Sequence, residues 1–181
     1  MPASVPFGDV SKPPLEPYPP DPPEAPEEPE LEAGLTDAVV GDADWANRRV
    51  FRVSVLRTVL QGVRLTGAEL AESTFRDVRF VDCRLDLVTA RLSRFERVVF
   101  SDCRMEECDL YGSRLTDVLF ERCTLREATI SGVTSERVEL RNCDLKGLRG
   151  AEALRGVRMP WNDVLANAPL FADVAGVEIV D

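Results

Sequence analysis

An apolar residue recurs at every fifth position between Phe51 and Gly150, and this period limits what the chain can form. We call it the central position of each pentad. A second, smaller residue lies two positions earlier, where Val, Cys, Ser, Ala and Thr occur, and the other three positions hold mostly Arg, Asp, Glu, Thr and Gly. The central positions are Val55, Leu60, Leu65, Leu70, Phe75, Phe80, Leu85, Ala90, Phe95, Phe100, Met105, Leu110, Leu115, Phe120, Leu125, Ile130, Ser135, Leu140 and Leu145.

A period of five fits neither a continuous helix nor a straight strand. Five helical residues turn about 140°, so the central residues would lie on every side of a helix. In a strand, an odd repeat moves the apolar residue to the opposite face at each pentad. The chain must therefore turn once per pentad, with both apolar positions pointing inward and the two residues after the central one forming a corner. Stacked coils of this kind share a continuous core.

Sorting the inward positions shows a longer period of twenty residues. At this spacing Phe80, Phe100 and Phe120 form one column. Valines form another from Val78 to Val138, and cysteines a third from Cys83 to Cys143. Four pentads per coil place like side chains above one another, and the hundred residues make about five coils. At the ~4.8 Å spacing of neighbouring strands, the stack is roughly 24 Å tall.

The unbroken pentads include Ala68-Glu69-Leu70, Cys108-Asp109-Leu110 and Cys143-Asp144-Leu145. These runs resemble the pentapeptide-repeat family. The resemblance implies a right-handed, four-sided β-helix, and thus an all-β solenoid. It covers a little over half of the chain and implies no single function, because the family's roles are diverse.

The charge is concentrated at the two ends of the chain. The whole chain has a net charge of −10, of which residues 1–50 carry −8 and residues 161–181 carry −4. Residues 51–160 carry +2. The repeat region is therefore close to neutral.

The first thirty residues hold eleven of the thirteen prolines together with most of the N-terminal acids. Such a segment buries little apolar area, so we expect residues 1–31 to be a disordered or polyproline II tail. Spacings such as Pro14-x-x-Pro17 are compatible with binding to an aromatic-lined groove, but an acidic solubilising tail is the simpler interpretation. No secretory signal or membrane span is present, which predicts a soluble cytoplasmic protein.

Both ends of an open solenoid need a cap. We expect residues 32–50 to cap the first coil through Trp45, with a partner-binding role for Trp45 as the alternative. The β-helix should span residues 51–159. Residues 160–181 should form a helical cap, with one short helix ending at Ala166 and a second starting near Pro169, followed by a short strand at 177–180.

The residue types argue against catalysis. The chain has no histidine, which removes the commonest general base and metal ligand. All five cysteines occupy the small inward position, where a line of one thiol per coil cannot surround an ion tetrahedrally. We therefore expect buried, reduced core cysteines, no cofactor, no metal site, no small-molecule substrate and no enzyme activity.

Three outward features remain. One corner column alternates Arg57, Asp77, Arg97, Asp117 and Arg137, which predicts a salt-bridged edge whose exposed pairs each contribute about 0–1 kcal/mol. The other two are candidate partner surfaces. Apolar residues lie outside the Phe column, where a partner or the chain's own tail could dock, and an arginine column on the next face could meet phosphates, an acidic partner or residues 16–32. Local pairing with Asp82, Asp86 and Asp102 is the simpler account of these arginines. The candidate residues are Val59, Val81, Val99 and Leu119 for the first surface and Arg64, Arg84 and Arg104 for the second.

These features predict a non-enzymatic scaffold that binds another protein, as a monomer or as a homodimer through the C-terminal end. The alternative, from resemblance to the quinolone-resistance branch of the family, is a DNA-mimicking modulator of a type II topoisomerase, DNA gyrase. A DNA mimic needs its negative charge on the rigid rod, whereas here the rod carries +2. A nucleic-acid target is disfavoured because the basic excess is small.

Overall fold

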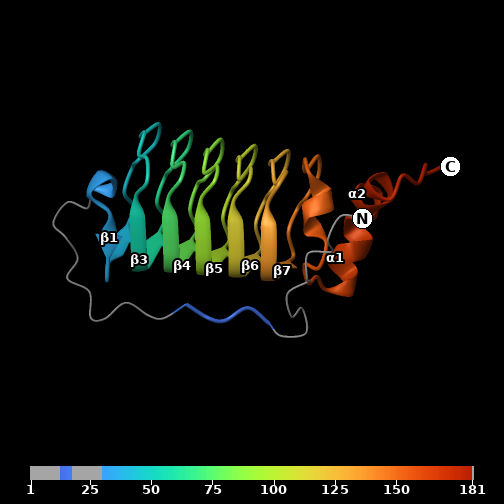
Figure 1. The fold of residues 1–181 in the computed structure, drawn as a ribbon, viewed down its shortest axis with the longest axis horizontal. Coiled ribbons are helices and arrows are strands. Elements are labelled where there is room, and N and C mark those ends of the chain that lie inside the picture. Colours follow the sequence, from blue (N-terminus) through green and yellow to red (C-terminus); the bar gives the residue numbers. More distant parts are fainter. Residues whose placement is uncertain (1–12, 18–29, 181) are drawn as a thin grey trace, which may run out of the picture.

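The structure, a computed structural model, describes residues 13–17 and 30–180. Its main feature is a β-solenoid of about five coils, in which parallel strands stack along one axis (Figure 1). The strands join one seven-stranded sheet in the order β1-β3-β4-β5-β6-β7, and β2 also pairs with β3. The strands are β1 (Leu35–Thr36), β2 (Val39–Gly41), β3 (Ser54–Gln61), β4 (Thr74–Val81), β5 (Arg94–Ser101), β6 (Arg114–Glu121) and β7 (Thr134–Arg141).

The strand register confirms the twenty-residue coil. Phe80 pairs with Phe100, which pairs with Phe120, and the valines of the same strands pair in the same way. The other two sides of each coil are joined by single parallel bridges, such as Arg64 to Arg84 and Glu69 to Thr89. Each coil therefore has four sides, as the four-pentad period predicted.

The two residues after each central position form the corner, and the second of them adopts a left-handed backbone. Positive φ values recur at this position through the whole stack, from Asp37 to Gly147. Asn, Asp and Gly enter this region at little cost, whereas Leu87 (φ 60°) and Leu92 (φ 55°) are unusual there. The corner geometry is thus imposed by the stack and does not depend on a glycine in each coil.

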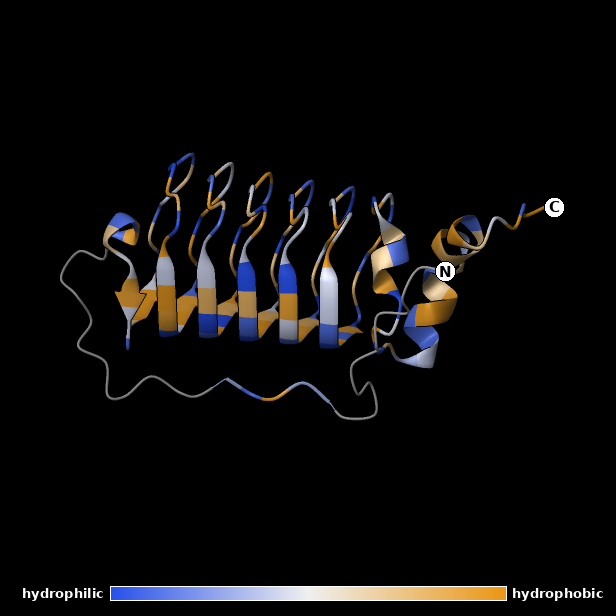
Figure 2. Ribbon diagram, viewed as in Figure 1, coloured by the Kyte–Doolittle hydropathy of each residue, from blue (hydrophilic) through white to orange (hydrophobic). Residues whose placement is uncertain are grey.

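The interior is filled by the two apolar positions of each pentad. Phe80, Phe100 and Phe120 stack nearly parallel, with ring centroids 4.7 Å and 4.9 Å apart. Offset stacking of this kind adds to the stabilisation that burial provides. Figure 2 shows the result as orange and blue segments that alternate around each coil.

The N-terminal end differs from the expected separate cap. After the 3-10 helix η1 (Leu31–Ala33), strands β1 and β2 already pair with β3, and Asp44 forms a bridge to Arg64. Residues 35–50 therefore form a coil in register with the next one. Trp45 occupies the central position of a pentad and is buried within the core. Leu31, 1% exposed, lies at the end of the same core.

The C-terminal end is covered by the 3-10 helix η2 (Ala151–Leu154) and by helices α1 (Trp161–Ala166) and α2 (Ala168–Val174). Two polar side chains close the last coil. Asn142 donates its backbone N–H to Asp163 (2.6 Å), and Leu145 donates its N–H to Asn167 (3.3 Å). Because no further coil follows, these two backbone N–H groups would otherwise have no hydrogen-bond acceptor. The predicted helical cap is confirmed.

The predicted strand at 177–180 is wrong. These residues form no regular structure, and Val180 is 80% exposed. The left-handed Gly176 ends α2, and the chain then leads away from the solenoid, so no sheet edge lies beside it (Figure 1). None of the helices in residues 13–17 and 30–180 is long and apolar enough to cross a membrane.

Candidate functional site

The outward residues of strands β3–β7 include both apolar and charged side chains. We call this surface the valine face, and define it by Val59, Arg79, Val99, Leu119 and Glu139, which stack in register. It contains three of the four apolar candidates from the sequence. The fourth, Val81, follows at the ends of the same strands and is half-buried.

The valine face is less accessible than an outward face normally is. Val59 and Leu119 are half-buried, and Val99 is only 6% exposed although it points away from the core. On the preceding side of the coils, Arg94 and Arg114 occupy the equivalent outward position and are exposed. The valine face therefore has additional cover.

Residues 13–17 of the N-terminal segment contact this face (Figure 1). Leu15 donates its backbone N–H to Asp117 (3.2 Å), and Glu16 forms an ion pair with Arg79 (3.1 Å). Pro17 is buried. The sequence left open whether the tail docks, and these contacts show docking for residues 13–17. The rest of the expected disordered tail, residues 1–12 and 18–29, lies outside the described residues.

One corner beside the valine face carries the predicted alternating charges. We call it the buried corner, defined by Asp37, Arg57, Asp77, Arg97, Asp117 and Arg137. Each arginine pairs with the aspartate one coil earlier: Arg57 with Asp37, Arg97 with Asp77 (2.6 Å), and Arg137 with Asp117 (2.6 Å).

The salt-bridged edge is thus confirmed, but its expected exposure is wrong. The side chains of Asp77 and Asp117 are only 6% and 3% exposed. Burial alone would raise the pKa of Asp117, but hydrogen bonds from Arg137 and from the N–H of Leu15 outweigh this and hold it below its ordinary value. The hydrogen bond from Arg97 to Asp77 likewise raises the pKa of Arg97. Asp117 and Arg97 are therefore both charged at neutral pH.

The corner on the other side of the valine face is open to solvent. We call it the exposed corner, defined by Asp82, Asp102, Arg122 and Asn142. Arg122 donates two hydrogen bonds to Asp102, at 2.7 Å and 2.9 Å. This interaction lowers the pKa of Asp102, although the pair is solvated.

The side of the coils after the exposed corner carries the predicted arginine column. We call it the arginine face, defined by Arg64, Arg84 and Arg104, which are all exposed and bridged in register. Arg64 pairs with Asp44 (3.2 Å) and Arg104 with Asp86 (3.7 Å). Asp86 is therefore a local partner as expected, whereas Asp102 pairs with Arg122 in the exposed corner. The structure places the apolar and arginine candidates on adjacent sides and does not join them into one site.

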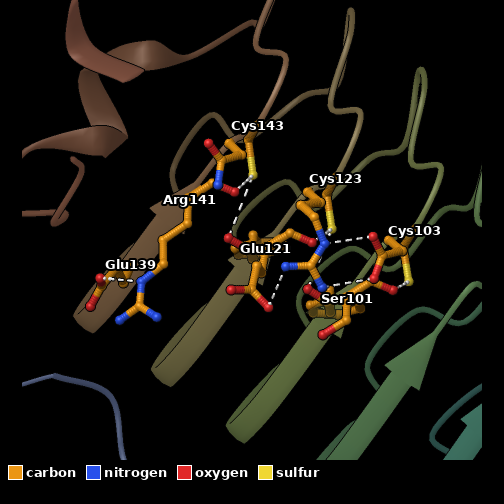
Figure 3. Close-up of polar contacts among 12 residues, drawn as sticks. Ser101, Cys103, Glu121, Cys123, Glu139, Arg141 and Cys143 are labelled. Atoms are coloured by element: carbon orange, nitrogen blue, oxygen red, sulfur yellow. Dashed lines mark hydrogen bonds and ion pairs between the residues drawn. The ribbon is translucent and has the colours of Figure 1, made fainter. Parts of the chain in front are cut away.

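The cysteines are buried, as the sequence predicted. Figure 3 shows Cys103, Cys123 and Cys143 one per coil, just beyond strands β5, β6 and β7. Each thiol faces backbone carbonyls. For example, Cys103 Sγ lies 3.3 Å from the carbonyl oxygen of Ser101 and 3.5 Å from that of Phe80. Burial raises the pKa of the separate Cys108 to about 12, so this thiol is not a nucleophile at neutral pH.

Two surface hollows were considered as ligand sites. A groove of about 710 Å³ lies between the last coil and the C-terminal helices, and its ionisable lining residues are Asp144, Lys146 and Asp173. A second, of about 200 Å³, is lined by Glu106, Glu107, Arg126, Glu127 and Lys146. Neither lining contains a nucleophile beside a base, and no cluster of three or more metal-binding side chains occurs within residues 13–17 and 30–180.

Two residues of the docking contact were not among the sequence candidates. Arg79 belongs to the same outward column as Val59 and Val99. Charged residues are usual at outward positions, so the sequence alone does not indicate Arg79 as a binding residue. Asp117 was assigned to the salt-bridged edge alone. A usable signal existed in both cases, since Arg79 lies one twenty-residue period from Val59 and Val99, and Asp117 lies two residues before Leu119.

Comparison with known proteins supports the fold. A family model for the pentapeptide repeat region matches residues 83–149, and a second for pentapeptide repeats in eight copies matches residues 57–89. No curated protein sequence matches the chain.

The solved structures that match are distant. A trypsin-treated form of QnrB1, a plasmid-mediated fluoroquinolone resistance protein, is 14% identical, with a TM-score of 0.36, over 82% of this chain and all of that one. A pentapeptide repeat protein from the Arabidopsis thaliana thylakoid lumen is 14% identical, with a TM-score of 0.32, over 71% and 73%. HetL from the cyanobacterium Nostoc, involved in heterocyst differentiation regulation, is 13% identical, with a TM-score of 0.26, over 68% and 75%.

These likenesses carry no functional argument at such scores. The two family models together cover residues 57–149, which lie within the coils that the twenty-residue register defines. Because the repeat, the four-sided coil and both models agree, the chain belongs to the pentapeptide-repeat protein family.

Proposed function

We propose that this protein is a non-enzymatic scaffold that binds another protein through the valine face. The proposal depends on one observation, which is that residues 13–17 of the same chain dock on this face. An extended peptide segment is held there by an acidic side chain on Arg79 and, at the adjoining buried corner, by a backbone N–H on Asp117. Binding of extended polypeptide by backbone and side-chain contacts on a sheet is a common mode of protein recognition.

The surrounding structure favours binding over chemistry. Parallel pairing in strict register makes the face a rigid platform, so a partner would meet preorganised side chains. Val99 and Leu119 supply apolar surface there, and Arg79 supplies charge. The exposed arginine face is a second candidate surface, suited to an acidic partner. The five unpaired, buried cysteines agree with a reducing, cytoplasmic location.

Affinity capture from native cytosol tests the proposal. Leu119→Glu places a carboxylate on the valine face, and Thr134→Glu places one on an exposed outward position of β7 as a matched control. We expect a partner that is retained by wild type and by Thr134→Glu and is lost with Leu119→Glu. A set of partners that is the same for all three proteins would contradict a role for the valine face.

A homodimer through the C-terminal end is the assembly we propose to test first. Trp161 of α1 is 72% exposed, and Leu165 and Val174 are also largely exposed, which is unusual for large apolar side chains. Sedimentation of wild type and of Trp161→Glu should then show a dimer and a monomer. A monomer in both cases would remove the proposal.

Modulation of DNA gyrase ranks second. It rests on the resemblance to the quinolone-resistance branch of the family and on the net charge of −10, but that charge belongs to the ends of the chain and not to the coils. Addition of the purified protein at micromolar concentration to a gyrase supercoiling assay tests this function. No change in supercoiling would eliminate this function.

A further inference from the structure

Residues 13–17 use few of their own side chains to hold the valine face. Leu15 contributes its backbone N–H, while the residue as a whole is 57% exposed. Glu16 contributes its carboxylate, and Pro17 is buried. The features that the face recognises are therefore an extended backbone, an acid and a neighbouring proline.

The solenoid supplies a matching group for the backbone and for the acid. Asp117 accepts the backbone N–H, and it is fixed in place by two hydrogen bonds from Arg137 (2.6 Å and 2.7 Å). Arg79 meets the acid, and the half-buried Leu119 lies in the same outward column. Proline-containing segments are already extended before binding, so they lose little conformational entropy when they dock.

We propose that residues 13–17 are a built-in competitor that covers the valine face, and that the partner displacing them is an extended, acidic, proline-containing peptide. This inference rests on the proposed function and names both the chemistry of the partner and its regulation. Only residues 18–30 separate the segment from the solenoid. A segment joined to the face through so few residues of the same chain has an effective concentration of the order of millimolar there, so even weak contacts can keep the face covered.

A competitor of this kind lowers the apparent affinity of a partner by the fraction of molecules with an open face. Opening the face should therefore strengthen binding of a peptide supplied in trans. Glu16→Arg reverses the charge that meets Arg79, while the solenoid itself stays unchanged. Because the substitution lies outside the coils, the fold is not at risk.

The test uses the full chain and a fluorescent synthetic peptide with the sequence of residues 11–19. Fluorescence anisotropy should show that the peptide binds Glu16→Arg about tenfold or more tightly than wild type, as expected for a face covered nine-tenths of the time. Hydrogen exchange at the Leu15 amide should be slower in wild type than in Glu16→Arg. Equal affinities, or no binding to either protein, would overturn the inference.

A charge exchange tests the specificity of the site. Arg79→Glu should no longer bind the original peptide and should bind a peptide with Arg at position 16. The matched control is Arg104→Glu, on the arginine face, combined with Glu16→Arg. This double variant should bind the original peptide as tightly as Glu16→Arg does. Loss of binding with Arg104→Glu would show a general charge effect and contradict the site. In the Trp161→Glu background, a mass that doubles with protein concentration and returns to that of a monomer when Glu16→Arg is added would show exchange of tails between two copies and overturn competition within one chain.

The two proposals fail in different ways. If captured cellular partners depend on Leu119 but the peptide binds neither protein, the scaffold function stands and the peptide chemistry is wrong. If the peptide binds as expected but Leu119→Glu leaves all cellular partners in place, the tail contact is real and the valine face is not the partner surface.

Discussion

The two corners beside the valine face contain the same ion pair in different surroundings. In the buried corner, Arg137 bonds Asp117 at 2.6 Å and 2.7 Å. In the exposed corner, Arg122 bonds Asp102 at 2.7 Å and 2.9 Å. The geometry is nearly equal, but the exposed fractions of the arginine and aspartate are 22% and 3% in the first pair and 49% and 39% in the second.

The difference shows that burial, and not hydrogen-bond geometry, separates the two corners. An exposed pair is screened by water, and removing one partner leaves the other solvated. In the buried corner the aspartate would remain away from water without its partner, which carries the cost of an unsatisfied buried charge. The buried corner should therefore be energetically important and the exposed corner should not.

The largest effect should come from the core column beside both corners. Phe100→Ala removes a ring stacked between Phe80 and Phe120, and should destabilise the protein by roughly 3–5 kcal/mol through the cavity left behind. Chemical denaturation measures this value. It sets the scale for the corner substitutions, and a loss below about 1 kcal/mol would contradict the stacked core.

The buried corner should follow. Arg97→Ala leaves Asp77, whose side chain is 6% exposed, without its two hydrogen bonds from Arg97. We expect a loss of about 1–3 kcal/mol. The double variant Arg97→Ala, Asp77→Ala should recover part of this loss, because it removes the buried carboxylate that has lost these two hydrogen bonds. If the double variant is no more stable than Arg97→Ala, the buried carboxylate is not the cause.

Acid should affect the buried corner through Asp117. Its folded-state pKa lies below the ordinary value of 3.8, so its contribution to stability is complete above that value and is lost as the pH falls through the folded pKa. Thermal melts of wild type and Asp117→Asn should differ at neutral pH, and the difference should close at acidic pH below 3.8. A constant difference across this range would show that the charge of Asp117 is not responsible.

Much of this architecture could be predicted because the twenty-residue period fixes which side chains stack. The Phe column, the buried cysteines and the Arg–Asp pairs all follow from position in the pentad. The period says nothing about cover that comes from outside the repeat. Asp77 and Asp102 occupy equivalent corner positions, and only the folded structure shows that the first is buried and the second exposed.

The docking contact escaped prediction for the same reason. Residues 13–17 have no repeat, so nothing in their sequence aligns Glu16 with Arg79 or Leu15 with Asp117. The ends of the solenoid show a related limit. Trp45 lies in the pentad frame and was still assigned to a separate cap, whereas Val177 and Ile179 have the composition of a strand but no sheet edge beside them.

The smallest effect should come from the exposed corner, and it is the sharpest check on the comparison. Arg122→Ala removes two hydrogen bonds of the same kind as those of Arg97, so a view based on geometry alone predicts equal losses for the two variants. Because water replaces the lost partner of Asp102, we expect the melting temperature to stay within error of wild type. We also expect no dependence on salt beyond that of wild type. A loss equal to that of Arg97→Ala would show that pairing across the coils, and not burial, stabilises the corners.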